Sequence, residues 1–487
     1  MTDEQSDLLA ERRAKLERLR DAGIEPFPHG FPDRTEIAAV RESHEGLEPG
    51  EETTDRYRVA GRLTAKRGHG KASFLDLRDG TGQIQIQARV DDLGNDAYQG
   101  LLSLDVGDIV GAEGTVFTSR RGELTIRADG WELLSKALRP PPEKFHGLED
   151  VETRYRRREL DLMANEASRE LFLTRTKTVS AVRRWLDSRG FIEVETPVLQ
   201  PLYGGALARP FTTHHNALDR DLYLRIATEL YLKRLVVGGI DKVYELGKDF
   251  RNEGISHKHN PEFTMLEWYE AYADYNDVAE ELEGLVSDVA QELLGTTELE
   301  REGETIDLAP PWRRVTLRDA INERTGIDVM DHPTREQLAE AMGTEPDVEE
   351  GWGKLVDGLL SKEVEPTLIQ PTFIVDYPVQ LSPFAKRHRS EEGLVERWEA
   401  FVGGIEISNA FTELNDPDEQ RRRFTEQAEE QARGDEETQP YDETFVESLE
   451  QGMPPTGGVG LGIDRLVMIL TGAKSLREVL LFPAMRT

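Results

Sequence analysis

The pattern of apolar and polar residues predicts a helix near the start of the chain. Leucines recur at mixed helical spacing over residues 6–21, and five basic residues lie between them. This pattern is typical of an amphipathic helix, and Gly23 can end it because glycine readily adopts the left-handed conformation found beyond helix C-termini. Two interpretations stay open: a solvated helix packed on its neighbour, and a helix that also contacts RNA.

Five segments with strand-like patterning follow, and turn signals separate them. They cover residues 57–64, 72–78, 83–89, 106–118 and 123–135, the last with a break at Gly130. Residues 79–82 (Asp-Gly-Thr-Gly) and 120–122 (Arg-Arg-Gly) are typical hairpin connections. Because no long helical pattern interrupts them, the five strands predict a small closed β-barrel.

Barrels of the OB type bind single-stranded nucleic acid on one face, through stacked aromatic rings and a mildly basic groove. Phe74, Arg78 and Gln85 lie on the two successive strands where that face is expected. The alternative is a generic barrel with Phe74 in its core.

The remainder of the chain mixes long helices with strands. Three prolines at 140–142 break regular structure and predict a linker. A helix is expected from about Leu171 to Gly190, followed by a strand over 191–195. Residues 276–362 look mostly helical and acidic, and are a candidate insertion.

The charge is uneven along the chain. The 487 residues include 60 Lys and Arg against 94 Asp and Glu, a formal net charge of −34. A uniformly acidic body would repel nucleic acid. Residues 57–139, however, hold twelve basic and eleven acidic side chains, so the predicted barrel is nearly neutral and the acidic excess lies elsewhere.

Composition also excludes several kinds of chemistry. The chain has no cysteine, which rules out disulfides, thiolate zinc sites and cysteine nucleophiles. It has no apolar run long enough to cross a bilayer, and its start lacks the pattern of a secretory signal. We therefore expect no membrane association and a cytoplasmic location.

The segment 242–272 carries the first candidate chemistry. It reads as a strand to Arg251, a polar turn, and a second strand from Glu262. Alternation puts Phe263, Met265, Glu267 and Tyr269 on one face of the second strand. A carboxylate among aromatic rings needs a partner, which could be Arg251 or a cationic ligand; a structural ion pair is the alternative. In the turn, His257 and His259 do not match a zinc site, and phosphate contact is the better interpretation.

Acidic residues cluster in a second apolar segment, 399–414. Glu399, Glu406 and Glu413 suit magnesium held against substrate phosphates. Glu406 and Glu413 would lie on opposite faces of an unbroken strand, so a shared site requires a bulge or a turn between them.

A glycine-rich segment, 457–465, ends in Ile-Asp-Arg and is predicted to be a turn leading into a helix. It is not a dinucleotide-binding motif, because only 25 residues follow Gly462. Glycines that let the backbone approach a base, followed by Arg465, would suit ATP.

Together these segments resemble the three signature motifs of the class II aminoacyl-tRNA synthetases. Residues 190–197 are similar to motif 1, 250–267 to motif 2 and 460–465 to motif 3. Further similarity to the lysine-specific members of that class lies at 71–74, 144–148, 204–211, 229–235 and 481–486.

The resemblance implies an α+β fold and an ATP-dependent lysine–tRNA ligase. The implied parts are a helical extension (1–55), a five-stranded OB-fold anticodon-binding domain (56–139), a linker (140–153), and a catalytic domain (154–487) built on an antiparallel sheet flanked by helices. Such enzymes activate L-lysine with ATP as lysyl-adenylate and transfer the lysyl group to the 3′ end of tRNA. They use Mg²⁺, and motif 1 forms a homodimer interface.

The resemblance also implies a role for each matching residue. The catalytic residues would be Arg251 and Arg465, and ATP would in addition contact Glu253, His259, Asn260 and Phe263. Lysine would be bound by Gly205, Glu229, Glu267, Tyr269, Asn409 and Glu413. Magnesium would be held by Glu399 and Glu406, and the anticodon by Phe74, Arg78 and Gln85.

The sequence departs from the pattern of the lysine-specific enzymes at two positions, and two alternative functions are considered. Thr228 stands where many relatives have proline, and Ala410 where glycine is common, which puts backbone rigidity in question. An aspartate- or asparagine-specific enzyme is disfavoured because an anionic substrate would call for a basic pocket residue. A non-catalytic RNA-binding paralogue would be expected to lack Arg251, Glu406 or Arg465, and all three are present.

Overall fold

The computed structural model of the chain describes residues 3–142, 148, 150–344, 351–432 and 440–486. The chain divides into two compact units, Met1–Glu149 and Asp150–Thr487. Most of the similarity segment 144–148, and parts of the predicted linker 140–153 and of the stretch 276–362, lie outside the described residues. No helix in the described ranges is both long enough and apolar enough to span a membrane.

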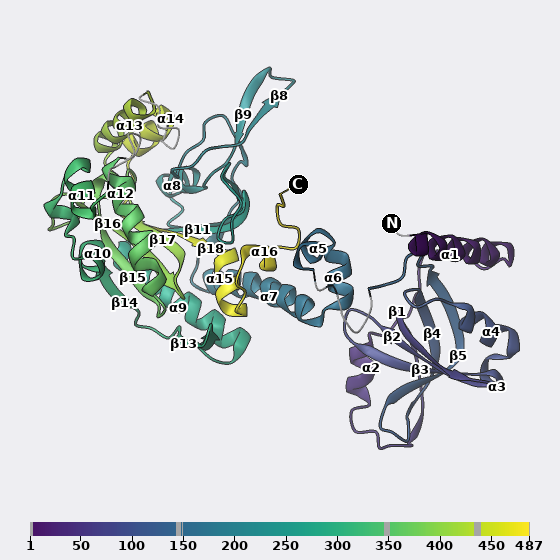
Figure 1. The fold of residues 1–487 in the computed structure, drawn as a ribbon. Helices are drawn as coiled ribbons and strands as arrows, with labels where there is room; N and C mark the ends of the chain where they lie inside the picture. The colour runs from purple at the N-terminus through teal and green to yellow at the C-terminus, as the bar shows by residue number, and fades with distance from the viewer. Residues whose placement is uncertain (1–2, 143–147, 149, 345–350, 433–439, 487) are drawn as a thin grey trace. The chain divides into compact units, whose positions relative to one another are not determined.

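The first unit is built on five strands whose pairing closes in the order β1-β2-β3-β5-β4 (Figure 1). They are β1 (Glu52–His69), β2 (Ala72–Arg78), β3 (Gln83–Arg89), β4 (Ile109–Thr118) and β5 (Leu124–Ser135). All five predicted strands and both hairpins are therefore present. The break predicted at Gly130 is a bulge in a continuous strand, because the β4–β5 register shifts between Glu113 and Gly114.

Among the described residues of this unit, four helices accompany the barrel: α1 (Asp3–Asp21), α2 (Ile37–Ser43), α3 (Val90–Leu93) and α4 (Asn95–Ser103). The helix predicted at 6–21 is α1, and Gly23 follows it with φ +74°. Helices α3 and α4 are a difference from the prediction of uninterrupted strands. They are short, and the Asp, Gly and Asn residues at 91–96 resemble a turn.

Side-chain alternation on β2 and β3 separates a core face from an outer face. Leu75, Leu77, Ile84 and Ile86 are almost completely buried in the core of the barrel. Phe74, Arg78 and Gln85 alternate with them, are only half-buried, and lie on the outer face. The alternative that put Phe74 in the core is therefore wrong.

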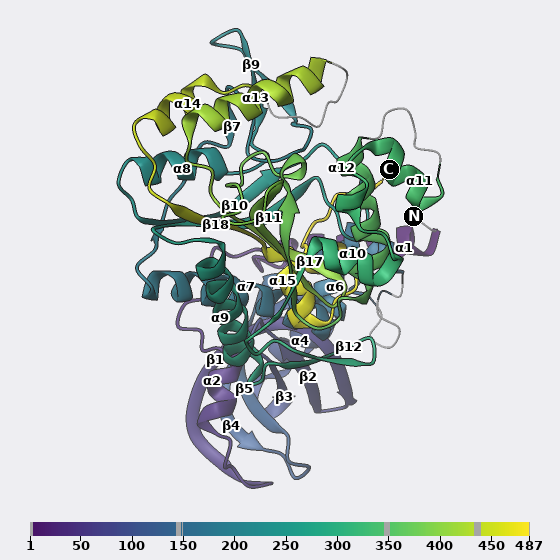
Figure 2. The same cartoon turned by 90° about the vertical axis from the view of Figure 1, so that its left-hand side faces the viewer.

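The second unit is built on an eight-stranded sheet in the order β14-β15-β16-β17-β18-β11-β10-β6. Four of its strands, β10, β11, β17 and β18, are labelled in Figure 2. All neighbours are antiparallel except the pairs β14–β15 and β10–β6. These strands are β6 (Ile192–Glu193), β10 (Lys242–Phe250), β11 (Glu262–Ala271), β14 (Arg313–Thr316), β15 (Thr372–Pro378), β16 (Leu394–Val402), β17 (Ile405–Thr412) and β18 (Thr456–Gly462). Two smaller sheets are formed by β12 (Glu298–Arg301) with β13 (Glu304–Asp307), and by β7 (Leu199–Gln200), β9 (Arg220–Leu224) and β8 (Thr212–His215).

The helices of this unit surround the sheet. They are α5 (Val151–Arg156), α6 (Arg158–Ala164), α7 (Glu166–Ser188), α8 (Glu229–Val237), α9 (Tyr275–Leu294), α10 (Leu317–Thr325), α11 (Arg335–Met342), α12 (Trp352–Leu359), α13 (Pro417–Ala432), α14 (Glu443–Glu450), α15 (Ile463–Thr471) and α16 (Leu476–Val479). Short turns of 3₁₀ or π helix are η1 (Val329–Asp331), η2 (Leu360–Val364), η3 (Glu365–Thr367) and η4 (Val379–Leu381). The predicted helix before Gly190 is α7, and the strand expected at 191–195 is limited to β6.

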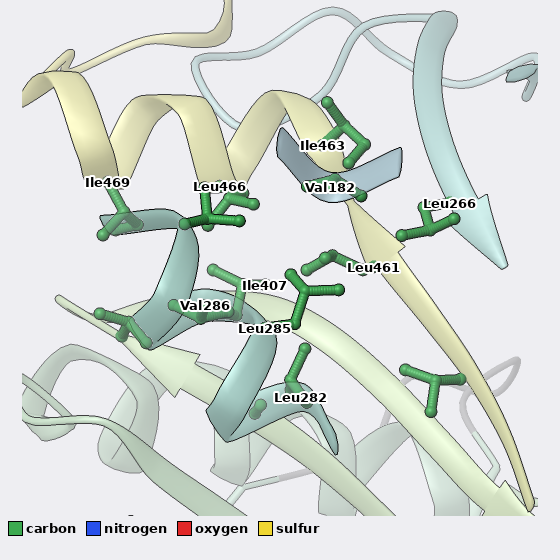
Figure 3. Packing of buried hydrophobic residues seen from close by; sticks show 14 of the residues in the cluster. Val182, Leu266, Leu282, Leu285, Val286, Ile407, Leu461, Ile463, Leu466 and Ile469 are labelled. Carbon is green, nitrogen blue, oxygen red and sulfur yellow. The ribbon is translucent and has the colours of Figure 1, made fainter. Parts of the chain in front are cut away.

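Three helices cover one face of the sheet and form the main core. Val182 of α7, Leu285 of α9 and Leu466 of α15 pack against Leu266 of β11 and Leu461 of β18 (Figure 3). Because successive strand residues point to opposite faces, the neighbours of these core residues face away from the helices. That second face of the sheet carries the candidate site.

The stretch 276–362 is part of this architecture and is not wholly helical. Helix α9 packs in the main core, and β14 is the edge strand of the main sheet. Helices α10 to α12 pack around a separate apolar cluster that includes Leu338 and Val356. The short strands β12 to β14, which lie between α9 and α10, were not predicted from the mostly helical and acidic pattern of this stretch.

Candidate active site

A cavity of about 330 Å³ lies on the face of the main sheet opposite α7, α9 and α15. It is lined by β11, β17 and β18, by the first turn of α8, and by the polar turn between β10 and β11. The lining contains every residue predicted for ATP, lysine and magnesium: Gly205, Glu229, Arg251, Glu253, His259, Asn260, Phe263, Glu267, Tyr269, Glu399, Glu406, Asn409, Glu413 and Arg465. The fold thus brings together residues that lie up to 260 positions apart in the chain.

Strand β11 presents the predicted face. Phe263, Met265, Glu267 and Tyr269 line the cavity, while Leu266 and Trp268 between them lie in the core. Glu267 has no ion-pair partner among the described residues. Its carboxylate accepts hydrogen bonds from the Thr228 backbone N–H (3.1 Å) and the Tyr269 hydroxyl (3.2 Å). Burial, reinforced by repulsion from Asp249 and Glu229, raises the pKa of Glu267 to about 8.

Thr228 therefore has a role that a proline could not fill. Its backbone N–H is the donor to Glu267, and proline has no N–H. Nearby, Gly205 has φ +88°, and a Cβ at this position would come within 3.0 Å of the Glu229 side chain. Both residues shape the wall against which Glu229 and Glu267 are held.

A buried cation stands between two of the carboxylates. The Lys233 ammonium contacts Glu229 Oε1 at 2.6 Å and forms a closer ion pair with Glu413 Oε2. Burial raises the pKa of Glu229 and raises that of Glu413 to about 8, and the charge of Lys233 opposes both shifts. Sequence reasoning gave Lys233 no role, although its spacing of four residues from Glu229 on one helix was a usable signal.

A bulge explains how Glu406 and Glu413 can both face the cavity. The predicted single strand is the hairpin β16–β17, which turns at Gly403 and Gly404, both at positive φ. Ser408 pairs with Ala400 and Glu406 pairs with Phe401, so Ile407 is the extra residue of a bulge. The bulge brings Glu406 to the face that carries Asn409 and Glu413, and all three line the cavity.

Glu399 is held by two residues that sequence reasoning missed. The Tyr377 hydroxyl donates to Glu399 Oε2 at 2.8 Å, and Arg397 Nη2 donates to Oε1 at 2.6 Å. Arg397 Nε also donates to Asn409 Oδ1 at 3.1 Å. Burial, reinforced by repulsion from Glu406, raises the pKa of Glu399 to about 7.

The glycine-rich segment is a strand, not the predicted turn. β18 pairs with β11 and β17, and α15 begins directly after it. A Cβ on Gly458 would lie 2.5 Å from the ring of Tyr269 and still closer to Glu413. Only glycine therefore fits beneath these two pocket residues. At the start of α15, Arg465 Nη1 donates to the carbonyl (2.7 Å) and the carboxylate (2.9 Å) of Glu406.

Basic side chains also line the cavity. Arg251 stacks over Phe263, with its guanidinium carbon 5.1 Å from the ring centroid, and it does not pair with Glu267. His259 accepts or shares a hydrogen bond with Ser256 (3.0 Å), and its pKa is lowered by burial and by Arg465. Lys258, between the two histidines, pairs with Glu365 at 3.3 Å.

In the first unit, Phe74, Arg78 and Gln85 share one outer surface. Gln85 lies opposite Asp76 and Gln87 lies opposite Phe74 in the β2–β3 pairing. The Thr125 hydroxyl donates to Gln85 Oε1 at 3.1 Å. Arg67 and Arg127 flank this surface, each paired with a carboxylate.

Each of the two units matches a known protein family. Residues 150–486 match the family of class II tRNA synthetases (D, K and N), and residues 57–134 match the OB-fold nucleic acid binding domain. The chain is 52% identical to the lysine–tRNA ligase of Moorella thermoacetica, over 99% of this chain and 98% of that protein. It is 51% identical to the lysine–tRNA ligases of Carboxydothermus hydrogenoformans and Bacillus subtilis, again over 99% of this chain and at least 98% of theirs. This chain therefore belongs to the class II aminoacyl-tRNA synthetases, in the lysine–tRNA ligase family.

Proposed function

We propose that the acidic end of the cavity binds L-lysine and that its arginine-containing end binds ATP. The chain is an ATP-dependent lysine–tRNA ligase: it activates lysine as lysyl-adenylate and transfers the lysyl group to the 3′ end of tRNA. The observation that carries the pocket assignment is the gathering of three buried carboxylates, Glu229, Glu267 and Glu413, at one end of the cavity.

The buried carboxylates select the substrate by charge. Glu229 and the backbone at Gly205 accept the α-ammonium, and Glu413, Glu267 and Tyr269 receive the side-chain ammonium, with Asn409 nearby. An uncompensated buried carboxylate is unfavourable, and an arriving ammonium group removes that penalty. Aspartate would add a negative charge to this end of the cavity and is rejected.

ATP lies at the other end, where Arg251 and Arg465 supply fixed positive charge. Arg251 bridges the lysine carboxylate and the α-phosphate, a task suited to a planar, bidentate donor. Phe263 stacks on the adenine, Arg465 covers the nucleotide from the opposite side, and Glu253, His259 and Asn260 complete the site.

The first reaction forms one bond and breaks one bond. A carboxylate oxygen of lysine attacks the α-phosphorus of ATP, the bond from this phosphorus to the bridging oxygen breaks, and pyrophosphate leaves. Arg251 holds the two reactants in line and neutralises charge on the α-phosphate, so positioning and electrostatics carry the catalysis. In the second reaction a ribose hydroxyl at the 3′ end of tRNA attacks the lysyl carbonyl carbon, and AMP leaves.

Glu399 and Glu406 are the proposed magnesium ligands. Among the described residues no three His, Cys, Asp or Glu side chains are grouped to hold a metal by themselves. Two carboxylates on one face nevertheless fit Mg²⁺, which takes its other ligands from phosphates and water. The ion neutralises phosphate charge when bound. Arg397 and Tyr377 orient Glu399, and Arg465 orients Glu406.

The outer face of the barrel is the proposed anticodon site. Phe74 stacks on an unpaired base, and Arg78 and Gln85 contact the backbone and base edges, which suits recognition of single-stranded RNA. The partner is the tRNA for lysine, and because it serves translation we propose a cytoplasmic location.

We also propose a homodimer formed through the motif 1 region. Leu173 on α7, Ile192 on β6 and Leu199 on β7 are large apolar side chains that are about half-exposed. Exposed apolar groups of this kind are typical of surfaces that another subunit covers.

Aminoacylation tests the proposal directly. The purified chain should attach radiolabelled lysine, and neither aspartate nor asparagine, to a transcript of lysine tRNA in the presence of ATP and magnesium. Charging with aspartate or asparagine would overturn the pocket assignment while leaving the family intact. Sedimentation at a series of protein concentrations tests the dimer separately.

A further inference from the structure

Lys233 is a buried cation that the reaction itself does not use. Its side chain is completely buried on α8, one turn after Glu229, and its ammonium lies between the carboxylates of Glu229 and Glu413. The ring of Phe384 lies on another side, with its centroid 5.2 Å from Nζ. Lys233 is absent from the residues that line the cavity, whereas both of its carboxylate partners line it.

This placement means that Lys233 acts on the substrate only through other residues. A bound lysine would contact Glu229 and Glu413 from the cavity, and Lys233 contacts the same two carboxylates from behind. The two faces of each carboxylate thus have different partners, one belonging to the protein and one to the ligand.

The charges of the pocket and the substrate balance only when Lys233 is counted. Glu229, Glu267 and Glu413, when ionised, bring three negative charges to the lysine end. One positive charge from Lys233 leaves two, which equals the number of ammonium groups on lysine. The substrate carboxylate is matched separately by Arg251. Without an internal cation, buried carboxyl groups this close together would take up protons instead of staying ionised.

We propose that Lys233 is a specificity-determining positioning residue, which favours the ionised forms of Glu229 and Glu413 and orients them so that the pocket accepts two ammonium groups. This inference rests on the proposed assignment of the lysine pocket. The direction of the carboxyl pKa values agrees with it, because burial raises those of Glu229 and Glu413 and the charge of Lys233 lowers both.

Lys233→Met tests the inference, because methionine keeps much of the side-chain volume and removes the charge. The readouts are the KM values for lysine and ATP in pyrophosphate exchange, and the inhibition constant of norleucine, which has the same carbon chain without the terminal ammonium. We expect the lysine KM to rise about tenfold or more while the ATP KM changes little. Discrimination between lysine and norleucine should fall by a similar factor, because a protonated pocket no longer favours the charged side chain. If the role of Lys233 were purely structural, Lys233→Met would raise the KM values for lysine and ATP in parallel. That result would overturn the inference.

Lys248→Met is the matched control. Lys248 also pairs with a glutamate, Glu262 at 3.6 Å, but it lies on β10 outside the cavity lining. The Lys248→Met variant should have the same lysine KM and the same discrimination between lysine and norleucine as the unmodified protein. Thermal melting of both variants reports on folding.

A double variant keeps the test decisive if Lys233→Met alone does not fold. Lys233→Met combined with Glu413→Gln removes one charge of each sign, so no extra charge is stranded. Because Lys233 contacts both Glu229 and Glu413, adding Lys233→Met to Glu413→Gln should raise the lysine KM by less than the roughly tenfold rise expected for Lys233→Met alone, the remaining effect acting through Glu229. Undiminished loss in that background would contradict the inference. If Glu413→Gln alone showed normal lysine kinetics, the assignment of the lysine pocket would be wrong, and the inference that rests on it would also fail.

Discussion

Glu413→Gln is the substitution that probes the lysine pocket most sharply. Glu413 is completely buried just after β17, its carboxylate contacts Lys233, and it lines the cavity together with Tyr269. Glutamine has nearly the same shape but no charge. The change therefore removes one charge from the lysine end and leaves the volume of the pocket intact.

The expected magnitude follows from the bond that is lost. A hydrogen bond to a charged group contributes about 1.5 to 3 kcal/mol. At about 1.4 kcal/mol for each factor of ten, the lysine KM should rise about tenfold to about a hundredfold. Lys233 keeps its contact with Glu229 at 2.6 Å, so its ammonium is not stranded and the variant should fold.

Lysine-dependent pyrophosphate exchange is the assay, with lysine and ATP varied separately. The lysine KM should rise while the ATP KM stays near its original value. Glu450→Gln is a suitable control because Glu450 is exposed and pairs with Arg421 at 2.7 Å, outside the cavity lining. Unchanged lysine kinetics in Glu413→Gln would remove Glu413 from the pocket.

Four further predictions follow from the site. Arg251→Ala should lower exchange by about a hundredfold or more, because it removes the charge that bridges the reactants; near-normal turnover in a protein that melts normally would refute that role. Gly458→Ala should raise the lysine KM at least about tenfold, since its Cβ would lie 2.5 Å from the Tyr269 ring. Gly460→Ala should change it less, because its nearest neighbour is 3.8 Å away; equal effects would contradict the steric argument. The kcat/KM for lysine should rise from about pH 6.5 to about pH 8.5, because burial raises the pKa values of Glu413 and Glu267 to about 8 and lysine binds the ionised forms; a flat profile would show that these groups are ionised throughout. Phe74→Ala should raise the KM for tRNA about tenfold while tRNA-independent exchange is unchanged, since stacking on a base is lost; unaltered tRNA kinetics would exclude Phe74 from the anticodon site.

Regular alternation made several strands predictable from the sequence. On β11 the alternate residues Leu266 and Trp268 are apolar and buried in the main core, so the face that carries Phe263, Glu267 and Tyr269 could be predicted from the sequence. The strands of the barrel were predicted for the same reason. In both cases local patterning and tertiary burial agree.

Other features depend on contacts between distant segments. The bulge at Ile407 exists only because β16 and β17 are paired, so the sequence could show that Glu406 and Glu413 need a bulge or a turn to share a face, but not where it lies. The glycines of β18 resemble a turn locally, yet they form a strand because β18 pairs with β11 and β17 on its two sides. Glycine is needed at 458 because Tyr269 and Glu413 occupy the space next to it. Lys233 was missed because its second partner lies 180 residues away.

The most direct test of the central claim is amino-acid-dependent exchange of pyrophosphate into ATP, without tRNA and in magnesium buffer. Lysine, aspartate, asparagine and no amino acid are compared in parallel. We predict exchange with lysine alone, because the buried carboxylates at one end of the cavity require a substrate with two ammonium groups. Exchange with aspartate or asparagine, or none with lysine, would contradict the account.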